Sequence, residues 1–226
     1  MILRSVTFDL DGTLLDTVAD LAEACRRMLE ELAFPARTPA EVHSFVGKGM
    51  VVLVERCLTH AEPPSEETLQ RAVVSFRRHY AEVSGLATTV YPGVREGLAA
   101  FRAAGYKLGV VTNKPDEFTR PLLAHMEMND FDVVVSGDTT AHKKPHPAPI
   151  LHACAAMGTD PQHTLHIGDS ANDVLAARAA GCAVYCVPYG YNEGQPVDSA
   201  ECDALVSNLL AALARCRQSS LLPSSS

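Results

Sequence analysis

The spacing of apolar residues changes along the chain, and this change separates two kinds of segment. Val6, Phe8 and Leu10 alternate with polar residues, as in a β-strand with one apolar face. From residue 16 to about residue 84 the apolar residues instead recur every three or four positions, with no strand pattern between them. These residues are therefore expected to form an all-helical insertion after the first strand.

Beyond residue 84 the pattern alternates between strands and helices with short connections. Strands are expected at residues 107–112, 131–135, 164–167 and 183–187, and helices at residues 94–104, 116–126, 147–157, 170–180 and 203–215. Such alternation is typical of a parallel sheet with helices on both faces. The fold class is therefore expected to be α/β, with a Rossmann-like parallel-sheet core.

These patterns predict three regions in the chain. The α/β core is discontinuous and comprises residues 1–15 and 85–217. A small helical domain, residues 16–84, interrupts it. The last residues, 218–226, are of low complexity and rich in serine, so they are expected to be disordered.

Composition and charge exclude several classes of partner. The chain has 226 residues, of which 47% are hydrophobic and 20% charged, as in ordinary globular proteins. The net charge is −8 and no basic run exceeds a pair, which argues against nucleic acid and anionic membranes as partners. No apolar run approaches the roughly 20 residues that a membrane span needs.

The first residues and the cysteines bear on the compartment. The chain leads directly into a strand, so no signal peptide is expected. The seven cysteines form no Cys-x-x-Cys pair and no cluster at zinc spacing, which favours free thiols. A reduced, cytoplasmic protein is expected, and the sequence leaves open whether it is a monomer or a homodimer.

Unusual polar residues gather where the predicted strands end. The carboxyl ends of parallel strands meet at one edge of a sheet, and ligands bind beyond that edge. The segments concerned carry Asp9 and Asp11, Thr112 and Asn113, Lys144, and Asp169 with Asp173. Residues that are distant in the sequence are therefore expected to meet at one site.

Asp9 and Asp11 end the first strand, and alternation places them on the same side of it. Two buried, unpaired carboxylates would repel each other, and the usual remedy is a bound cation. Oxygen ligands without sulfur or imidazole favour Mg²⁺. The alternative is a solvated loop that happens to contain two aspartates.

A phosphate monoester at this edge would find groups suited to its hydrolysis. Asp9 could supply an oxygen nucleophile and a metal ligand, giving an aspartyl-phosphate that water then attacks. Asp11 could protonate the leaving alkoxide and afterwards deprotonate a water molecule.

The remaining segments could complete the site. Thr112 and Asn113 offer a hydroxyl and amide N–H groups for phosphate oxygens, although they could form an ordinary polar turn. Lys144 lies in a proline-stiffened loop that could hold its ammonium group, although a lone Lys-Pro is usually a solvated surface feature. Asp169 would complete the metal ligands, and Asp173 would orient them or a water molecule, or merely cap a helix.

In order, these four segments resemble the motifs of the haloacid dehalogenase superfamily of phosphohydrolases, over nearly the whole chain. The resemblance implies that Asp9 is the nucleophile, and that Asp11 is the general acid/base and a Mg²⁺ ligand through its backbone carbonyl. It implies that Thr112 and Lys144 bind the phosphoryl group and that Asp169 binds Mg²⁺. Dehalogenases of this fold lack the second aspartate, so Asp11 implies a phosphatase.

The helical insertion resembles the cap domain of this family, which would close over the site and exclude water. Within it, Lys48 lies between two glycines in Phe45-Val46-Gly47-Lys48-Gly49-Met50. This loop and the segments 143–147 and 187–192 resemble phosphoglycolate phosphatases, which implies that Lys48 pairs with the carboxylate of 2-phosphoglycolate. The alternative is a turn between helices with an incidental lysine.

The expected partner is a small anionic phosphate ester, and several rival functions stay open. The chain could hydrolyse a sugar phosphate, a nucleotide or pyrophosphate instead. A phosphomutase is less favoured because no pair of cap residues that would orient a bisphosphate is evident. A catalytically inert binding module should have lost at least one motif, and all four are present. His146 and His166 are assigned no role.

Overall fold

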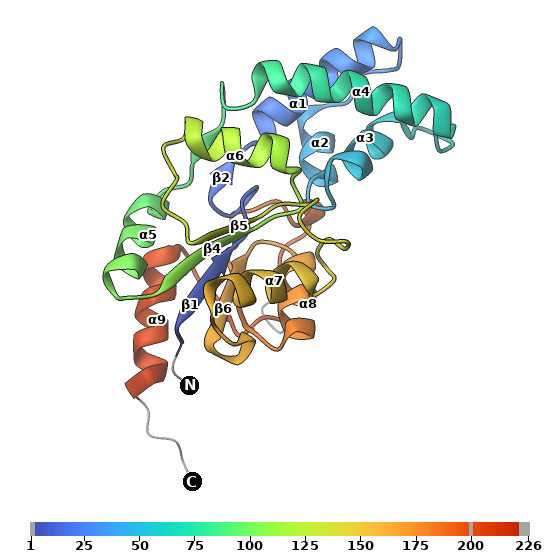
Figure 1. Ribbon diagram of the computed structural model, residues 1–226. Helices are drawn as coiled ribbons and strands as arrows, with labels where there is room; N and C mark the ends of the chain where they lie inside the picture. Colours follow the sequence, from blue (N-terminus) through green and yellow to red (C-terminus); the bar gives the residue numbers. More distant parts are fainter. Residues whose placement is uncertain (1–2, 199–200, 222–226) are drawn as a thin grey trace.

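The computed structural model describes residues 3–198 and 201–221 (Figure 1). Within these residues the main sheet has six strands in the order β5-β4-β1-β6-β7-β8, and every neighbouring pair is parallel. The strands are β1 (Ser5–Phe8), β4 (Lys107–Val111), β5 (Val133–Val135), β6 (Thr164–Gly168), β7 (Ala183–Cys186) and β8 (Ala204–Leu205). The expected α/β fold with a parallel-sheet core is confirmed.

Helices cover both faces of the sheet, because its strands are apolar on both sides. On one face α5 (Val94–Ala103), α6 (Asp116–His125) and α9 (Leu209–Leu221) pack against a cluster that includes Phe8 and Val110. On the other face α7 (Ala148–Met157) and α8 (Ala171–Ala180) pack on Val111 and Val184. Figure 1 shows α5 and α9 together on one side and α7 and α8 together on the other.

The end of the chain differs from the expectation. Residues 204 and 205 form strand β8 beside β7, where a helix was expected to have begun. The last helix begins at Leu209 and runs to Leu221, so it includes residues 218–221 of the tail that was expected to be disordered. Residues 222–226 lie outside the described residues. A strand of two residues is too short to produce a recognisable periodicity, so the sequence predicted a helix where β8 lies.

Four helices lie between β1 and the rest of the sheet, as expected. They are α1 (Val18–Glu31), α2 (Pro39–Phe45), α3 (Met50–Leu58) and α4 (Glu66–Val83). Their apolar faces form one buried cluster, which also takes in Phe118 of α6 and Tyr191. The contact through Phe118 and Tyr191 fixes the helices above the carboxyl edge of the sheet.

The two connections to these helices lie side by side. Strand β2 (Leu15–Asp16) enters them, strand β3 (Thr89–Val90) leaves them, and the two strands pair antiparallel. The buried carboxylate of Asp20 in α1 accepts four hydrogen bonds from the second connection, from the N–H groups of Gly85, Ala87 and Thr88 and from the Thr88 hydroxyl. One side chain thus joins the first turn of α1 to the second connection.

Two further expectations concern membranes and cysteines. Within the described residues, no helix has the length and apolar character that crossing a membrane would require. All seven cysteines are free and buried.

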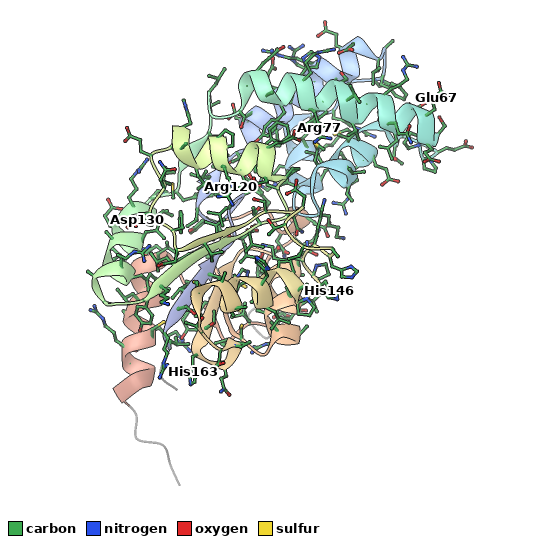
Figure 2. All side chains as sticks on the ribbon, viewed as in Figure 1. Glu67, Arg77, Arg120, Asp130, His146 and His163 are labelled. Atoms are coloured by element: carbon green, nitrogen blue, oxygen red, sulfur yellow. The ribbon has the colours of Figure 1, made fainter. Side chains whose placement is uncertain are left out.

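Replacing Asp20 with alanine should destabilise the protein by about 3 kcal/mol, because buried N–H donors lose their acceptor. The free energy of unfolding would be measured by urea denaturation followed by circular dichroism. Glu67→Ala is a matched control, since Glu67 is also an acidic residue in the first turn of a helix but is exposed at the outer end of α4 (Figure 2). Similar losses in the two variants would contradict this role for Asp20.

Candidate active site

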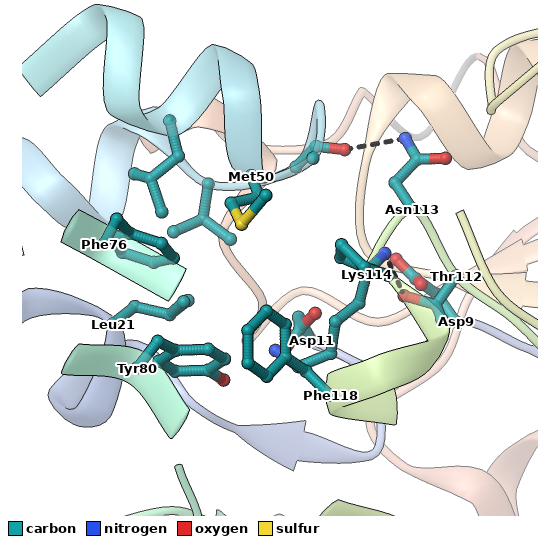
Figure 3. A pocket seen from close by; sticks show the side chains of 15 residues that line it. Asp9, Asp11, Leu21, Met50, Phe76, Tyr80, Thr112, Asn113, Lys114 and Phe118 are labelled. Carbon is teal, nitrogen blue, oxygen red and sulfur yellow. Dashed lines mark hydrogen bonds and ion pairs between the residues drawn. The ribbon is translucent and has the colours of Figure 1, made fainter. Parts of the chain in front are cut away.

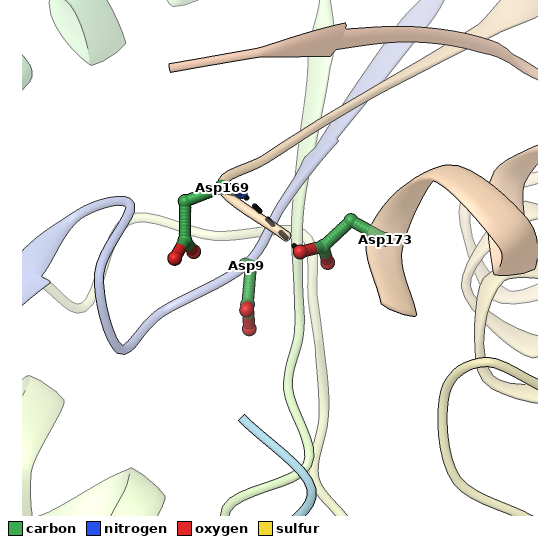
Figure 4. A group of neighbouring side chains, drawn as sticks. All are labelled: Asp9, Asp169 and Asp173. Atoms are coloured by element: carbon green, nitrogen blue, oxygen red, sulfur yellow. Dashed lines mark hydrogen bonds between the residues drawn. The ribbon is translucent and has the colours of Figure 1, made fainter. Parts of the chain in front are cut away.

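The carboxyl ends of β1, β4 and β6 are neighbours in the sheet, so the segments that follow them meet. Asp9 follows β1, Thr112 follows β4, and Asp169 follows β6. Carboxylate oxygens of Asp9, Asp169 and Asp173 all lie within 4.8 Å of one another (Figure 4). The topology thus brings together acidic residues that are about 160 positions apart in the sequence.

The ammonium group of Lys144 separates two of these carboxylates. Its Nζ lies 2.8 Å from Oδ1 of Asp9 and 2.7 Å from Oδ1 of Asp173, and the lysine side chain is only 1% exposed. Burial alone would lower the pKa of Lys144, but the charges of Asp173 and Asp9 raise it above its ordinary value. The group is therefore held charged between two anions.

Asn113 positions the Lys144 loop with both ends of its side-chain amide. Its Oδ1 accepts a hydrogen bond from the N–H of Lys144, and its Nδ2 donates to the carbonyls of Lys144 and Gly47. The Asn113 side chain is thus engaged with the protein, and only its main-chain N–H has no acceptor among the described residues. Its binding of phosphate through that N–H stays a prediction, as does binding through the buried Thr112 hydroxyl.

Asp173 is more heavily bonded than the sequence suggested. Its Oδ2 accepts from the Ser170 hydroxyl and main chain in the capping box of α8, and its Oδ1 accepts from Lys144 and lies 3.0 Å from Nε2 of His166. Burial would raise the pKa of Asp173, but Lys144 and His166 lower it far below its ordinary value. Asp173 therefore caps a helix and holds Lys144 in place. Its predicted effect on metal ligands stays a prediction.

His166 is buried between Thr7 and Asp173. Its Nδ1 lies 2.9 Å from the Thr7 hydroxyl. Burial lowers the pKa of His166. It lies inside the sheet rather than at the reacting edge, whereas His146 lies on an exposed loop (Figure 2).

Asp169 is held by groups from two other segments. Its Oδ1 accepts from the Thr13 hydroxyl at 2.8 Å, and its Oδ2 accepts from the main-chain N–H of Tyr191 at 2.7 Å. Burial, and then the charge of Asp173, raise the pKa of Asp169 to about 7. Gly12 and Gly190 lie directly against its carboxyl group, where a Cβ atom would be 2.6 Å and 2.4 Å from Oδ2.

Tyr191 connects Asp169 with the entrance to the helices. Its hydroxyl donates to Oδ1 of Asp16 and accepts from the main-chain N–H groups of Thr17 and Val18. Tyr191 lies in the segment 187–192, which resembles phosphoglycolate phosphatases, but the sequence alone indicates no role for it. A hydrogen bond across about 175 residues leaves no trace in local spacing.

Asp9 and Asp11 have different surroundings, although only one residue separates them. Oδ1 of Asp9 accepts from Lys144 and from the main-chain N–H of Leu10, whereas its Oδ2 has no partner among the described residues. Burial raises the pKa of Asp9 well above its ordinary value, with Lys144 opposing this and the neighbouring aspartates adding to it. Oδ1 of Asp11 instead accepts from the Thr17 hydroxyl at 2.6 Å and from Lys114 at 2.9 Å.

The sequence alone does not predict Lys114 as a site residue. It follows Asn113 directly at the end of β4, and a lysine at a strand end, before a proline, was the only signal. Its side chain is 4% exposed, with Nζ 4.8 Å from the centre of the Tyr80 ring. Burial would lower the pKa of Lys114, but Asp11 and Tyr80 raise it above its ordinary value.

Lys48 lies away from these residues. Its Nζ is 3.1 Å from Oε1 of Glu193, which also binds Arg56 at 2.6 Å, and its side chain is 41% exposed. Gly47 and Gly49 on either side of it line the pocket over Asp9, whereas the Lys48 side chain pairs outside that lining. Its predicted binding of substrate stays a prediction.

The pocket above Asp9 and Asp11 has one polar side and one apolar side (Figure 3). Asp9, Asp11, Thr112, Asn113 and Lys114 supply the polar groups. The helices and α6 supply an apolar wall that includes Leu21, Met50, Phe76, Tyr80 and Phe118. The volume of the pocket is about 50 Å³, which is room for a few water-sized groups.

The acidic residues at this edge fit a hard divalent cation. Asp9 and Asp169 offer carboxylate oxygens, and no sulfur or imidazole ligand accompanies them in the group. Burial and the charges of neighbouring aspartates raise the pKa values of both, and a bound cation would favour their charged forms. Asp11 lies outside the group of converging carboxylates, and its predicted binding of metal through its carbonyl stays a prediction.

Comparison with known proteins agrees with this site. The model of the haloacid dehalogenase-like hydrolases matches residues 6–187. The chain is 50% identical over 223 residues to a phosphoglycolate phosphatase of Nitrosospira multiformis, covering 96% of this chain and 97% of the relative. It is 39% identical to the phosphoglycolate phosphatase of Escherichia coli K12, covering 93% and 92%.

Solved structures give the same result. A crystal structure described as a predicted phosphoglycolate phosphatase from Haemophilus somnus 129PT is similar, with a TM-score of 0.89 and 33% identity. That similarity covers 94% of this chain and 97% of the other. A second structure, described as a putative phosphoglycolate phosphatase from Lactobacillus delbrueckii, has a TM-score of 0.85 at 24% identity and supports the fold alone.

Replacing Gly12 with alanine should weaken metal-dependent phosphatase activity about tenfold or more, because the new Cβ displaces Asp169. The loss should shrink as the metal concentration rises, which titration with p-nitrophenyl phosphate as substrate would measure.

Gly105→Ala is the matched control for this variant. The two glycines have nearly equal φ values, +88° and +86°, but no atom lies within 4 Å of a Cβ built at Gly105. Both variants should lose some thermal stability to the strained backbone. Only Gly12→Ala should change the metal requirement, and an equal change in both would refute the effect through Asp169.

Proposed function

The chain belongs to the haloacid dehalogenase-like hydrolases, and from this premise we propose that it hydrolyses 2-phosphoglycolate to glycolate and phosphate through an aspartyl-phosphate, with Mg²⁺ as cofactor. The coarser activity follows from its relatives: it is a phosphoric monoester hydrolase similar to phosphoglycolate phosphatases. The finer statements are supported by the arrangement of charges at the carboxyl edge of the sheet.

The contrast between Asp9 and Asp11 carries the proposal. Asp9 keeps one carboxylate oxygen without a partner among the described residues, while Lys144 fixes the other. That free oxygen attacks phosphorus, the ester P–O bond breaks, and a phosphoryl group is left on Asp9. Asp11, held by Thr17 and Lys114, gives a proton to the leaving glycolate oxygen.

The second half of the reaction reverses the role of Asp11. It takes a proton from a water molecule, which attacks phosphorus, releases phosphate and restores the Asp9 carboxylate. Thr112 and the main-chain N–H of Asn113 are proposed to bind the phosphoryl oxygens beside Lys144. Donors aimed at the developing negative charge would stabilise the transition state.

Asp9, Asp169 and the carbonyl of Asp11 are proposed to hold the Mg²⁺ ion. When bound, the ion would offset the charge of the phosphoryl group and of the carboxylates around it. Three carboxylates crowded within 4.8 Å support this, since one ammonium group does not balance them. Asp173 is proposed to act on these ligands indirectly, by fixing Lys144.

The size and walls of the pocket support a small substrate. The space of about 50 Å³ over Asp9 and Asp11 supports a small substrate. Residues 16–84 are proposed to act as a cap domain, because they supply most of the apolar wall over Asp9. Hydrolysis of another small phosphate ester remains the alternative.

Replacing Asp9 with asparagine should lower kcat for 2-phosphoglycolate about 10³-fold or more, since the amide is a poor nucleophile. Wild-type enzyme quenched in acid during turnover of radiolabelled substrate should carry a hydroxylamine-sensitive label, and the variant should carry none. Asp130→Asn is the control, because Asp130 is an exposed aspartate far from the site (Figure 2). Retained turnover in the Asp9 variant would refute its role as nucleophile.

Removing metal with EDTA should abolish hydrolysis, and adding Mg²⁺ should restore it. Asp169→Asn should raise the Mg²⁺ concentration for half-maximal activity about a hundredfold, because a charged ligand is lost. Isothermal titration calorimetry with Mg²⁺ alone gives a readout that does not depend on turnover. Activity that persists in EDTA would contradict the cofactor assignment.

A further inference from the structure

We propose that Lys114 and Tyr80 together form the subsite that binds the carboxylate of the substrate. Lys114 comes from the loop between β4 and α6, whereas Tyr80 comes from α4 of the helical insertion. The inference rests on the proposed function, and it specifies what recognises the non-reacting end of the substrate. The two residues line the same pocket as Asp9 and Asp11.

Lys114 supplies a buried cation with donors to spare. Its ammonium group binds Oδ1 of Asp11 at 2.9 Å and lies over the ring of Tyr80. An ammonium group has three donors, so one anion does not saturate it. Lys144 in the same site binds two carboxylates, at 2.8 Å and 2.7 Å, and both belong to the protein. Among the described residues Lys114 has only one such partner, so a substrate carboxylate could be its second.

Tyr80 supplies a polar atom that lacks a partner. The residue is 1% exposed, and its buried hydroxyl has no hydrogen-bond partner among the described residues. Burial raises the pKa of this hydroxyl, and Lys114 and Ser84 lower it as nearby hydrogen-bonding groups, but the geometry of neither contact is that of a formed hydrogen bond. A buried hydroxyl without a partner is costly, so a ligand oxygen there would relieve that cost.

The surroundings select a small anionic group. The rings of Phe76, Tyr80 and Phe118 and the side chain of Leu21 close the side of the pocket near Lys114 (Figure 3). In such a poorly solvated space an ammonium–carboxylate contact is stronger than at an exposed site. A carboxylate placed here would share one pocket with a phosphoryl group on Asp9, since Asp9, Lys114 and Tyr80 all line it.

Lys48 is the weaker candidate for the same role. It is 41% exposed and already pairs with Glu193, so a substrate would have to compete with an existing ion pair. The sequence favoured Lys48 because two glycines flank it, but the flanking glycines reach the pocket while the lysine does not.

The test compares 2-phosphoglycolate with ethyl phosphate, which has the same two-carbon length and no carboxylate. Tyr80→Phe should raise KM for 2-phosphoglycolate about tenfold, and the change for ethyl phosphate should be clearly smaller. The inhibition constant of glycolate, measured against ethyl phosphate hydrolysis, should rise by a similar factor. Tyr106→Phe is the control, a tyrosine at the opposite end of β4.

Lys114→Met extends the test to the cation. Because Lys114 also touches Asp11, this variant should lose kcat on both substrates, with a further loss in KM that is specific to 2-phosphoglycolate. Circular dichroism and thermal unfolding would establish that each variant folds. A loss confined to Lys48→Met, with Tyr80→Phe unaffected, would overturn the subsite in favour of Lys48.

Two outcomes separate this inference from the proposed function. A preference of the wild-type enzyme for 2-phosphoglycolate that survives in Tyr80→Phe and Lys114→Met would overturn the subsite and leave the proposed substrate standing. Equal use of the two substrates by the wild-type enzyme would refute both, since a carboxylate subsite must favour the carboxylated ester.

Discussion

Buried like charges repel one another, and three aspartate side chains meet within 4.8 Å at the carboxyl edge of this sheet. The arrangement depends on the ammonium group of Lys144, which lies between Asp9 and Asp173 and is almost completely buried. Removing one partner from such a network leaves an uncompensated buried charge, which costs several kcal/mol. The network therefore fixes the positions of the side chains, and the surplus of negative charge leaves a place for a divalent cation.

The site also gives different surroundings to Asp9 and Asp11, which are near neighbours in the sequence. Lys144 approaches Asp9 from one loop, whereas Lys114 approaches Asp11 from another. Each carboxylate thus has its own cation, and two chemically identical groups can take different roles in one reaction. The pocket beside them is apolar on the side of the helices, which would limit the access of water during the proposed proton transfers.

The sequence predicted the parallel sheet and the inserted helices because both depend on local periodicity, and it located the acidic residues because they follow predicted strands. It could not predict Tyr191 or the Lys48–Glu193 pair, since these contacts join residues that are far apart in the chain. Lys114 was missed for a related reason: its importance comes from Tyr80 and Asp11, which reach it only in the folded chain. Strand β8 was too short to give a pattern.

Tyr191 binds Asp169 with its main-chain N–H and the entrance to α1 with its hydroxyl, so a single residue belongs to two parts of the molecule. Any swing of α1 away from the sheet pulls on the same backbone that fixes the carboxylate. If a cation binds at Asp169, its affinity and the orientation of the helices would be linked through Tyr191, and by reciprocity each would bias the other to the same extent.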